Sequence, residues 1–163
     1  MKKFPFTKHL SSIGFLMSRF RPATSLKMVN NSGAYATHPL GFSQGVRLTQ
    51  PDLWILSGQV GWNQLRQFNA DGSFADQIAQ ALSNIAGILR EEGLGVEAIA
   101  HLRFCVVGID SEKVKMINQE LSGIFPGEYK PATTVIGISG LARPELLIEV
   151  EAIAQCAGHS AGI

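Results

Sequence analysis

Two carboxylates in an otherwise apolar segment near the end of the chain are the residues best suited to chemistry. Glu149 and Glu151 stand at alternate positions of the segment LLIEVEAIA. In an extended strand alternate residues share a face and lie about 7 Å apart. A carboxylate pair can position water and move protons, or it can form structural ion pairs. Both interpretations remain open for Glu149.

The remaining residues of this segment indicate how the carboxylates are housed. Ile148, Val150, Ala152 and Ala154 share the opposite face, which is suited to packing under helices. A strand face open to water normally carries Lys or Thr rather than two acids in an apolar run. The predicted elements include no further helix to cover the acidic side. The sequence therefore predicts a homo-oligomer that packs sheet faces together.

The hydrophobic pattern predicts the elements that position this strand. GFSQGVRL and LWILSGQV, separated by Pro51-Asp52, predict a β-hairpin. Apolar residues at spacings of three and four predict a helix after the N-cap Ser73, ending at Gly93. AIAHLRFCVVGI predicts a buried strand, SEKVKMINQELSGIF a second helix with Ser111 as N-cap, and TTVIGISG and LLIEVEAIA two further strands, joined by a hairpin loop that contains Arg143.

The resulting order, β-β-(short β)-α-β-α-β-β, defines an α+β protein with both helices on one face of the sheet. We expect one domain over residues 40–156, preceded by an extension of residues 1–39 and followed by a short tail of residues 157–163. Residues 1–50 contain seven Lys or Arg and no acid, whereas residues 51–163 contain seven Lys or Arg and thirteen Asp or Glu. We interpret the basic extension as flexible. An organelle transit peptide is the main alternative, and a secretory signal fits less well because its apolar run is short.

Composition excludes several classes of protein. A chain of 163 residues with 45% hydrophobic and 17% charged residues is typical of one soluble domain. No C-x-x-C or H-E-x-x-H motif is present and the four histidines are scattered, so we expect no metal and no cofactor. No apolar run approaches the roughly 20 residues of a membrane span, so we expect a cytoplasmic protein with no membrane partner. The acidic main domain argues against a nucleic-acid partner.

From Gly41 onward the chain resembles the Rid family, also called YjgF or L-PSP proteins. The resemblance rests on GFSQGV, LWILSGQV, QIAQALSN followed by IAGILREEG, HLRFCVV, Asn118 ahead of Phe125-Pro126, PATTVIGIS and LARPELLIEVEAIA. It implies the chorismate-mutase type of α+β fold. It also implies a homotrimer in which three sheets form a central barrel and three clefts open between subunits.

The resemblance also implies an activity and a site. Studied members hydrolyse imines and enamines, made from amino acids by pyridoxal-phosphate enzymes, to a 2-keto acid and ammonia. By this resemblance Glu149 is the catalytic residue that orients water, Ser57 and Gly58 of LSGQ line the cleft, and Asn118 is a polar residue of the cleft. Phe42 stands where an aromatic residue, frequently Tyr, closes the pocket.

The chain departs from the active pattern at the position that binds the substrate carboxylate. Active members carry an Arg directly after a Pro-Ala pair and usually a Cys two residues later, whereas here Pro131-Ala132 is followed by Thr133 and Val135. Loss of a charge-assisted pair costs about 1.5 to 3 kcal/mol of binding. The primary hypothesis is a deaminase of weak or altered specificity that binds an imine, enamine or carbonyl metabolite. A non-catalytic ligand-binding or scaffold trimer is the alternative, and a ribonuclease is the least favoured.

Several of these residues also have purely structural interpretations. Thr133 suits any strand, although its hydroxyl could bind a ligand. Asn118 could cap a helix or bridge loops. Cys105 is expected to act as a small hydrophobe in a buried strand. Arg103, Lys130 and Arg143 are the nearest replacement cations, and we expect Lys130 and Arg143 to be solvated surface charges.

Overall fold

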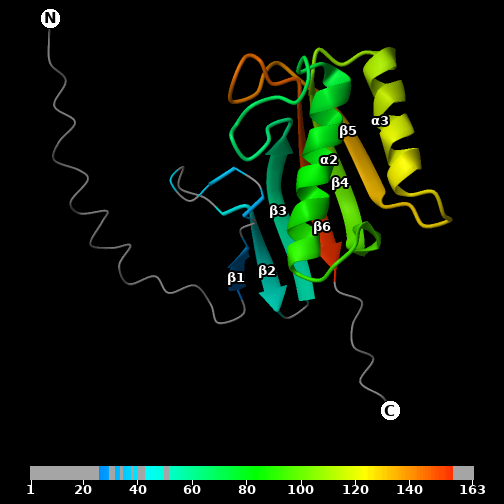
Figure 1. The fold of residues 1–163 in the computed structure, drawn as a ribbon. Helices are drawn as coiled ribbons and strands as arrows, with labels where there is room; N and C mark the ends of the chain where they lie inside the picture. Colours follow the sequence, from blue (N-terminus) through cyan, green and yellow to red (C-terminus); the bar gives the residue numbers. More distant parts are fainter. Residues whose placement is uncertain are drawn as a thin grey trace, which may run out of the picture.

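A six-stranded mixed sheet with two helices packed on one face forms the body of the molecule (Figure 1). The computed structural model describes residues 26–29, 32–33, 35–37, 39, 43–49 and 52–155. The strands lie in the order β1-β2-β3-β6-β4-β5. The elements are β1 (Leu26–Val29), β2 (Gly45–Thr49), β3 (Asp52–Val60), α2 (Phe74–Glu91), the short 3₁₀ turn η2 (Val96–Ala98), β4 (Ile99–Val107), α3 (Ser111–Ile124), β5 (Ala132–Ile138) and β6 (Ile148–Gln155).

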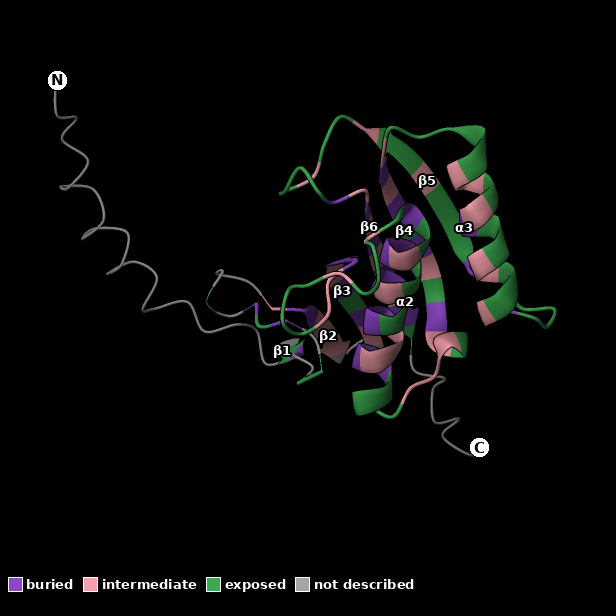
Figure 2. Ribbon diagram, turned by 45° about the horizontal axis from the view of Figure 1, so that its top comes forward, coloured by how far each residue is buried: buried purple, intermediate pink, exposed green. Residues whose placement is uncertain are grey.

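Strand β6 occupies the centre of the sheet and has two contrasting faces. It pairs antiparallel with β3 on one side and with β4 on the other. Its helix-side residues, Ile148, Val150, Ala152 and Ala154, are at most 1% exposed and belong to the main hydrophobic core. Glu149 and Glu151 lie half-buried on the other side, and Figure 2 shows how burial varies along the sheet and the helices. The predicted division of this strand into a packed face and an acidic face is confirmed.

Both helices were predicted from their apolar spacing, and both are present. The Ser73 hydroxyl accepts a hydrogen bond from the Asp76 N–H in a capping box, and Gly93, with φ +74°, follows the end of α2. The N-cap of α3 is Asp110, whose side chain accepts from the Lys113 N–H, and Ser111 is already helical. The predicted Ser111 cap is therefore wrong by one residue. A carboxylate at the N-cap also interacts favourably with the helix dipole.

The two last strands are not joined as a hairpin, contrary to the expected loop around Arg143. Strand β5 pairs parallel with β4 at the edge of the sheet, and β6 lies between β3 and β4. Alternation of apolar residues sets which face of a strand is buried, but it does not select the neighbouring strand. Residues 139–147 consequently connect two strands that have β4 between them.

The folded domain begins earlier than the predicted boundary at residue 40. Strand β1 pairs with β2, and Val29, Tyr35 and Thr37 are at most 5% exposed. The short strand that we placed after the hairpin thus lies before it, and the described part of the chain has no strand between β3 and α2. The remainder of the predicted extension, residues 1–25, and the tail of residues 157–163 lie outside the described residues.

Truncation tests this early start. A chain that begins at residue 40 loses the burial of Val29 and Tyr35, and fully burying one large apolar side chain contributes about 1.5 to 3 kcal/mol. We expect the free energy of unfolding, measured with urea, to fall by at least about 2 kcal/mol. A chain that begins at residue 26 is the control. Equal unfolding midpoints for the two chains would show that residues 26–39 do not stabilise the domain.

Candidate functional site

Glu149 lies at the point where three strands meet. It pairs with Val60 in β3 and with Cys105 in β4, and its side chain projects from the face of the sheet opposite the helices. A β-carbon at Gly58 would collide with Glu149 Oε1. The carboxylate therefore rests against the Cα atom of Gly58, and a side chain at that position would displace it.

A break in strand pairing creates this close approach. The register of β3 against β6 shifts between Leu56 and Gln59, which places Ser57 and Gly58 in a bulge. The Ser57 N–H donates to the Gln44 carbonyl at 2.7 Å, and the Ser57 hydroxyl donates to the Ser43 carbonyl at 2.7 Å. Bulges redirect side chains and are frequent beside active sites. Two hydrogen bonds thus fix the bulge that receives the Glu149 carboxylate.

The electrostatics distinguish Glu149 from its neighbour on the strand. Burial raises the pKa of Glu149 above the ordinary 4.5, and the nearby Glu151 carboxylate raises it further. Glu151 forms an ion pair with Arg103 at 3.0 Å, whereas the Glu149 side chain has neither an ion pair nor a hydrogen bond with the described residues. A raised pKa makes a carboxylate a better proton acceptor, because it lies closer to the operating pH.

Cys105 lies on the same face, beside the two carboxylates. Burial, then Glu151 and Glu149, raise the pKa of its thiol, and Arg103 opposes them. We define the acidic face as the side of the sheet away from the helices around Arg103, Cys105, Glu149 and Glu151. Cys105, which we expect to act as a small hydrophobe in a buried strand, is half-buried on this face.

Sequence reasoning missed Gln77, which fixes the start of β6. Its Nε2 donates to the carbonyls of Gly72 and Glu145, and its Oε1 accepts from the Leu147 N–H at 2.9 Å. The side chain is 1% exposed, and Leu147 is two residues before Glu149. A second buried amide, Asn84, donates to the carbonyls of Val60 and Trp62. The sequence did contain a signal for both residues, because Gln77 and Asn84 are polar side chains on the apolar face of one predicted helix.

Tyr35 was also missed, because it falls within the predicted extension. It packs with Val60 and Leu146, and its ring meets the Trp62 ring edge-on at 5.9 Å. Burial and then the charge of Glu149 raise the pKa of the Tyr35 hydroxyl, while Arg66 lowers it. An aromatic hydroxyl therefore lies within electrostatic reach of Glu149. Phe42, the aromatic residue predicted here, lies outside the described residues.

Within one chain the predicted site residues fall into two groups. Ser57, Gly58 and Glu149 come together at the bulge. Thr133 pairs in register with the buried Leu102, so it lies on the helix side of the sheet, exposed, with its hydroxyl 3.2 Å from the Pro131 carbonyl. Asn118 is exposed on α3, where its carbonyl accepts a hydrogen bond from the Ser122 hydroxyl. The sheet thus separates the two groups.

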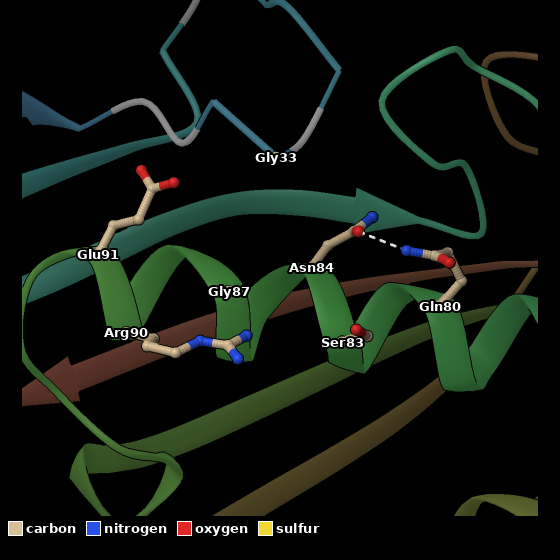
Figure 3. Close-up of a pocket in the computed structure, with 7 residues that line it drawn as sticks. All are labelled: Gly33, Gln80, Ser83, Asn84, Gly87, Arg90 and Glu91. Carbon is tan, nitrogen blue, oxygen red and sulfur yellow. Dashed lines mark hydrogen bonds between the residues drawn. The ribbon is translucent and has the colours of Figure 1, made fainter.

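The surface is hollowed in two places that bear on this geometry. A cavity of about 500 Å³ opens on the acidic face and is lined by apolar residues of β2, β3 and β6 together with Ser57, His101, Arg103 and Glu151. A polar cavity of about 350 Å³ lies along α2 and contains none of the predicted residues (Figure 3). In it Gln80 donates to Asn84 Oδ1 at 2.7 Å, and the Arg90 side chain lies along the helix. Its lining residues are Gly33, Gln80, Ser83, Asn84, Gly87, Arg90 and Glu91.

No group of three or more His, Cys, Asp or Glu in the described part of the chain could hold a metal ion. No helix among the same residues is long and apolar enough to cross a membrane.

A sheet with one helical layer and a bulge-seated carboxylate defines an α+β protein of the YjgF type, and comparison with known proteins identifies the family. The family described as Endoribonuclease L-PSP matches residues 35–156. The chain belongs to this family, which is the Rid family of the sequence resemblance. None of the curated proteins matches it.

Solved structures agree with this assignment. YyfB, a Rid-family protein from Yersinia pestis, is 30% identical with a TM-score of 0.62, and the match covers 81% of this chain and 99% of that one. The YjgF gene product from Escherichia coli is 28% identical with a TM-score of 0.67, covering 79% and 98%. YyfA from Yersinia pestis, at 22% identity, shares the fold with a TM-score of 0.70, covering 80% and 99%. The predicted family and fold class are confirmed.

The pH dependence of stability tests the environment of Glu149. The pKa of Glu149 is higher in the folded chain than in the unfolded chain, so above pH 4.5 the folded chain binds more protons. Ionisation of Glu149 therefore destabilises the fold as the pH rises through the folded pKa. We expect Glu149→Gln to raise the melting temperature at pH 7, with a gain that vanishes below pH 4.5. Glu145→Gln, at an exposed position outside the acidic face, is the control. A lower melting temperature for Glu149→Gln at pH 7 would instead indicate a structural ion pair across an interface.

Proposed function

We propose that the protein binds a small imine, enamine or carbonyl metabolite in clefts between subunits and hydrolyses the imine with altered specificity. The observation that carries this proposal is the Glu149 carboxylate, half-buried against Gly58 with a raised pKa and no partner in the described part of the chain. A structural carboxylate is normally paired when it is buried. A half-buried one with a raised pKa and no partner is a candidate general base.

The chemistry asked of Glu149 is two proton transfers in each direction. The carboxylate accepts a proton from water as the water oxygen bonds to the imine carbon, and the C=N electron pair moves to nitrogen. The carboxyl returns this proton to nitrogen, which gives a carbinolamine. The carboxylate then takes the proton of the new hydroxyl group and passes it to nitrogen, so that the C–N bond breaks as the carbonyl forms and imine and water give a carbonyl compound and ammonia. Burial favours this role because it brings the pKa of the base closer to neutral pH.

The location of the cleft follows from the two faces of the sheet. The acidic face has no helix over it in the described chain, and Ile55 and Ile136 are 48% and 41% exposed. Packing this face against other copies would bury both side chains. Thr133 on the edge strand β5 and Asn118 on α3 lie across the sheet from Glu149 of their own chain, so they can meet a Glu149 side chain only if it belongs to a neighbouring subunit. These points support a homotrimer with sites between subunits.

A non-catalytic trimer is the second candidate, and Thr133 favours it. Its hydroxyl lies 3.2 Å from the Pro131 carbonyl, and a neutral side chain there offers no charge to a substrate carboxylate. A third function is suggested by the name of the family, which includes the word endoribonuclease. Residues 51–163 contain seven basic and thirteen acidic residues, a balance that disfavours binding to phosphates.

Sedimentation tests the assembly. We expect a mass near three times 17.6 kDa at micromolar concentration. Ile55→Glu should dissociate it, because the variant places a charge in an apolar interface. Leu65→Glu is a matched control at a residue that is 69% exposed and lies in the loop after β3. A wild-type monomer would contradict the proposed inter-subunit cleft.

Thr133→Arg tests whether the cleft is competent for imine hydrolysis. A guanidinium at this position can bind a substrate carboxylate, which is worth about 1.5 to 3 kcal/mol, so we expect kcat/KM for 2-iminopropanoate to rise about tenfold to a hundredfold. Ser83→Arg, which adds the same charge at an exposed position of α2, is the control. A folded, trimeric and inert Thr133→Arg variant would favour the non-catalytic alternative.

A further inference from the structure

The charges on the acidic face are unbalanced around Glu149. On β4 and β6, the titratable groups of this face are His101, Arg103, Cys105, Glu149 and Glu151. Arg103 already pairs with Glu151, and the His101 ring lies 3.4 Å from the Thr134 hydroxyl. From the surrounding segments, the hydroxyl of Tyr35 and the guanidinium of Arg66 approach this region. This face thus carries two carboxylates and one arginine, and that arginine is already ion-paired.

Three cations of the described chain near the sheet ends have other partners. The Arg66 guanidinium donates to the Ala36 carbonyl at 3.1 Å and lies over the Tyr35 ring. The Lys113 ammonium donates to the carbonyls of Val107 and Gly108, and Lys130 donates to the Phe125 carbonyl. None of these cations forms an ion pair with Glu149 in the described chain. A positively charged ligand would therefore supply what the carboxylate lacks.

We propose that the substrate is a protonated imine without a carboxylate, of the kind formed when an amine is oxidised. This inference rests on the proposed function and names its substrate class. The iminium cation can form a charge-assisted hydrogen bond with Glu149. On the same face, Val46, Ile55 and Ile153 line a cavity together with Arg103 and Glu151, and these apolar side chains suit the hydrocarbon body. A substrate carboxylate in the same place would meet two like charges and one arginine that is already paired.

The reaction balances without any further reagent. An iminium R–CH=NH₂⁺ and one water give the aldehyde R–CHO and NH₄⁺. The class of reaction that supplies the substrate is the oxidation of a primary amine to its imine. The product is an aldehyde, whereas an amino-acid imine would give a 2-keto acid.

A matched pair of substrates measures how the substrate's own carboxylate changes the rate of hydrolysis. Imines generated from 3-methylbutylamine and from leucine differ only by the carboxylate group, and the acceleration of hydrolysis over the uncatalysed rate is measured for each. We expect the wild-type protein to accelerate the amine-derived imine at least about tenfold more than the leucine-derived one. This preference should weaken with added salt, because it is electrostatic.

Two charge variants should move the preference in opposite directions. Glu151→Gln removes one negative charge and releases Arg103, so the preference should fall about threefold or more, as expected for one charge about 7 Å away in water. Arg103→Gln removes the cation and should raise it by a similar factor. Because each result is a ratio of two substrates measured on one variant, a general loss of activity cancels.

The outcomes separate this inference from the proposed function. Acceleration of neither imine overturns the proposed function and this inference with it. A preference for the leucine-derived imine, or variants that shift the ratio in the same direction, overturns the inference alone and indicates that a neighbouring subunit supplies a cation. A preference for the amine-derived imine that responds oppositely to the two variants supports it.

Discussion

The close contact between the Glu149 carboxylate and the backbone of Gly58 is the constraint on which the site depends. It requires a residue without a side chain, an irregularity in β3 to make room, and a central strand to hold the acid in place. The sheet order satisfies the last requirement, since β6 is hydrogen-bonded on both sides. A carboxylate held in this way is partly removed from water, which raises its pKa, and the Glu151 carboxylate raises it further.

The helix side of the sheet stabilises this arrangement. The apolar residues of β6 pack in the main core, while Gln77 on α2 forms hydrogen bonds with the segment that leads into β6. Leaving these buried backbone groups unpaired would cost about 1 to 3 kcal/mol each. The packed layer thus fixes the register of β6, and the opposite face of the strand is the one that we propose for binding and assembly.

Local patterns predicted the parts of this structure that depend on periodicity. The alternation in β6 and the apolar spacing of α2 each reflect one buried face, so both could be recognised. The parts that depend on long-range pairing could not. Nothing in TTVIGISG indicates that β5 pairs parallel with β4, and this pairing places Thr133 across the sheet from Glu149. Tyr35 was missed because its burial depends on packing with Val60 and Leu146, far away in the sequence.

The role proposed for Glu149 depends on the ionisation of its carboxyl group, which can be observed directly. Selective ¹³C labelling of glutamate and an NMR titration of the assembled protein would follow the Glu149 carboxyl carbon, assigned by its absence in Glu149→Gln. A base in a half-buried, unpaired setting should titrate clearly above 4.5. A midpoint at or below that value would show that Glu149 is solvated or ion-paired in the assembly, and it would contradict the role proposed for it.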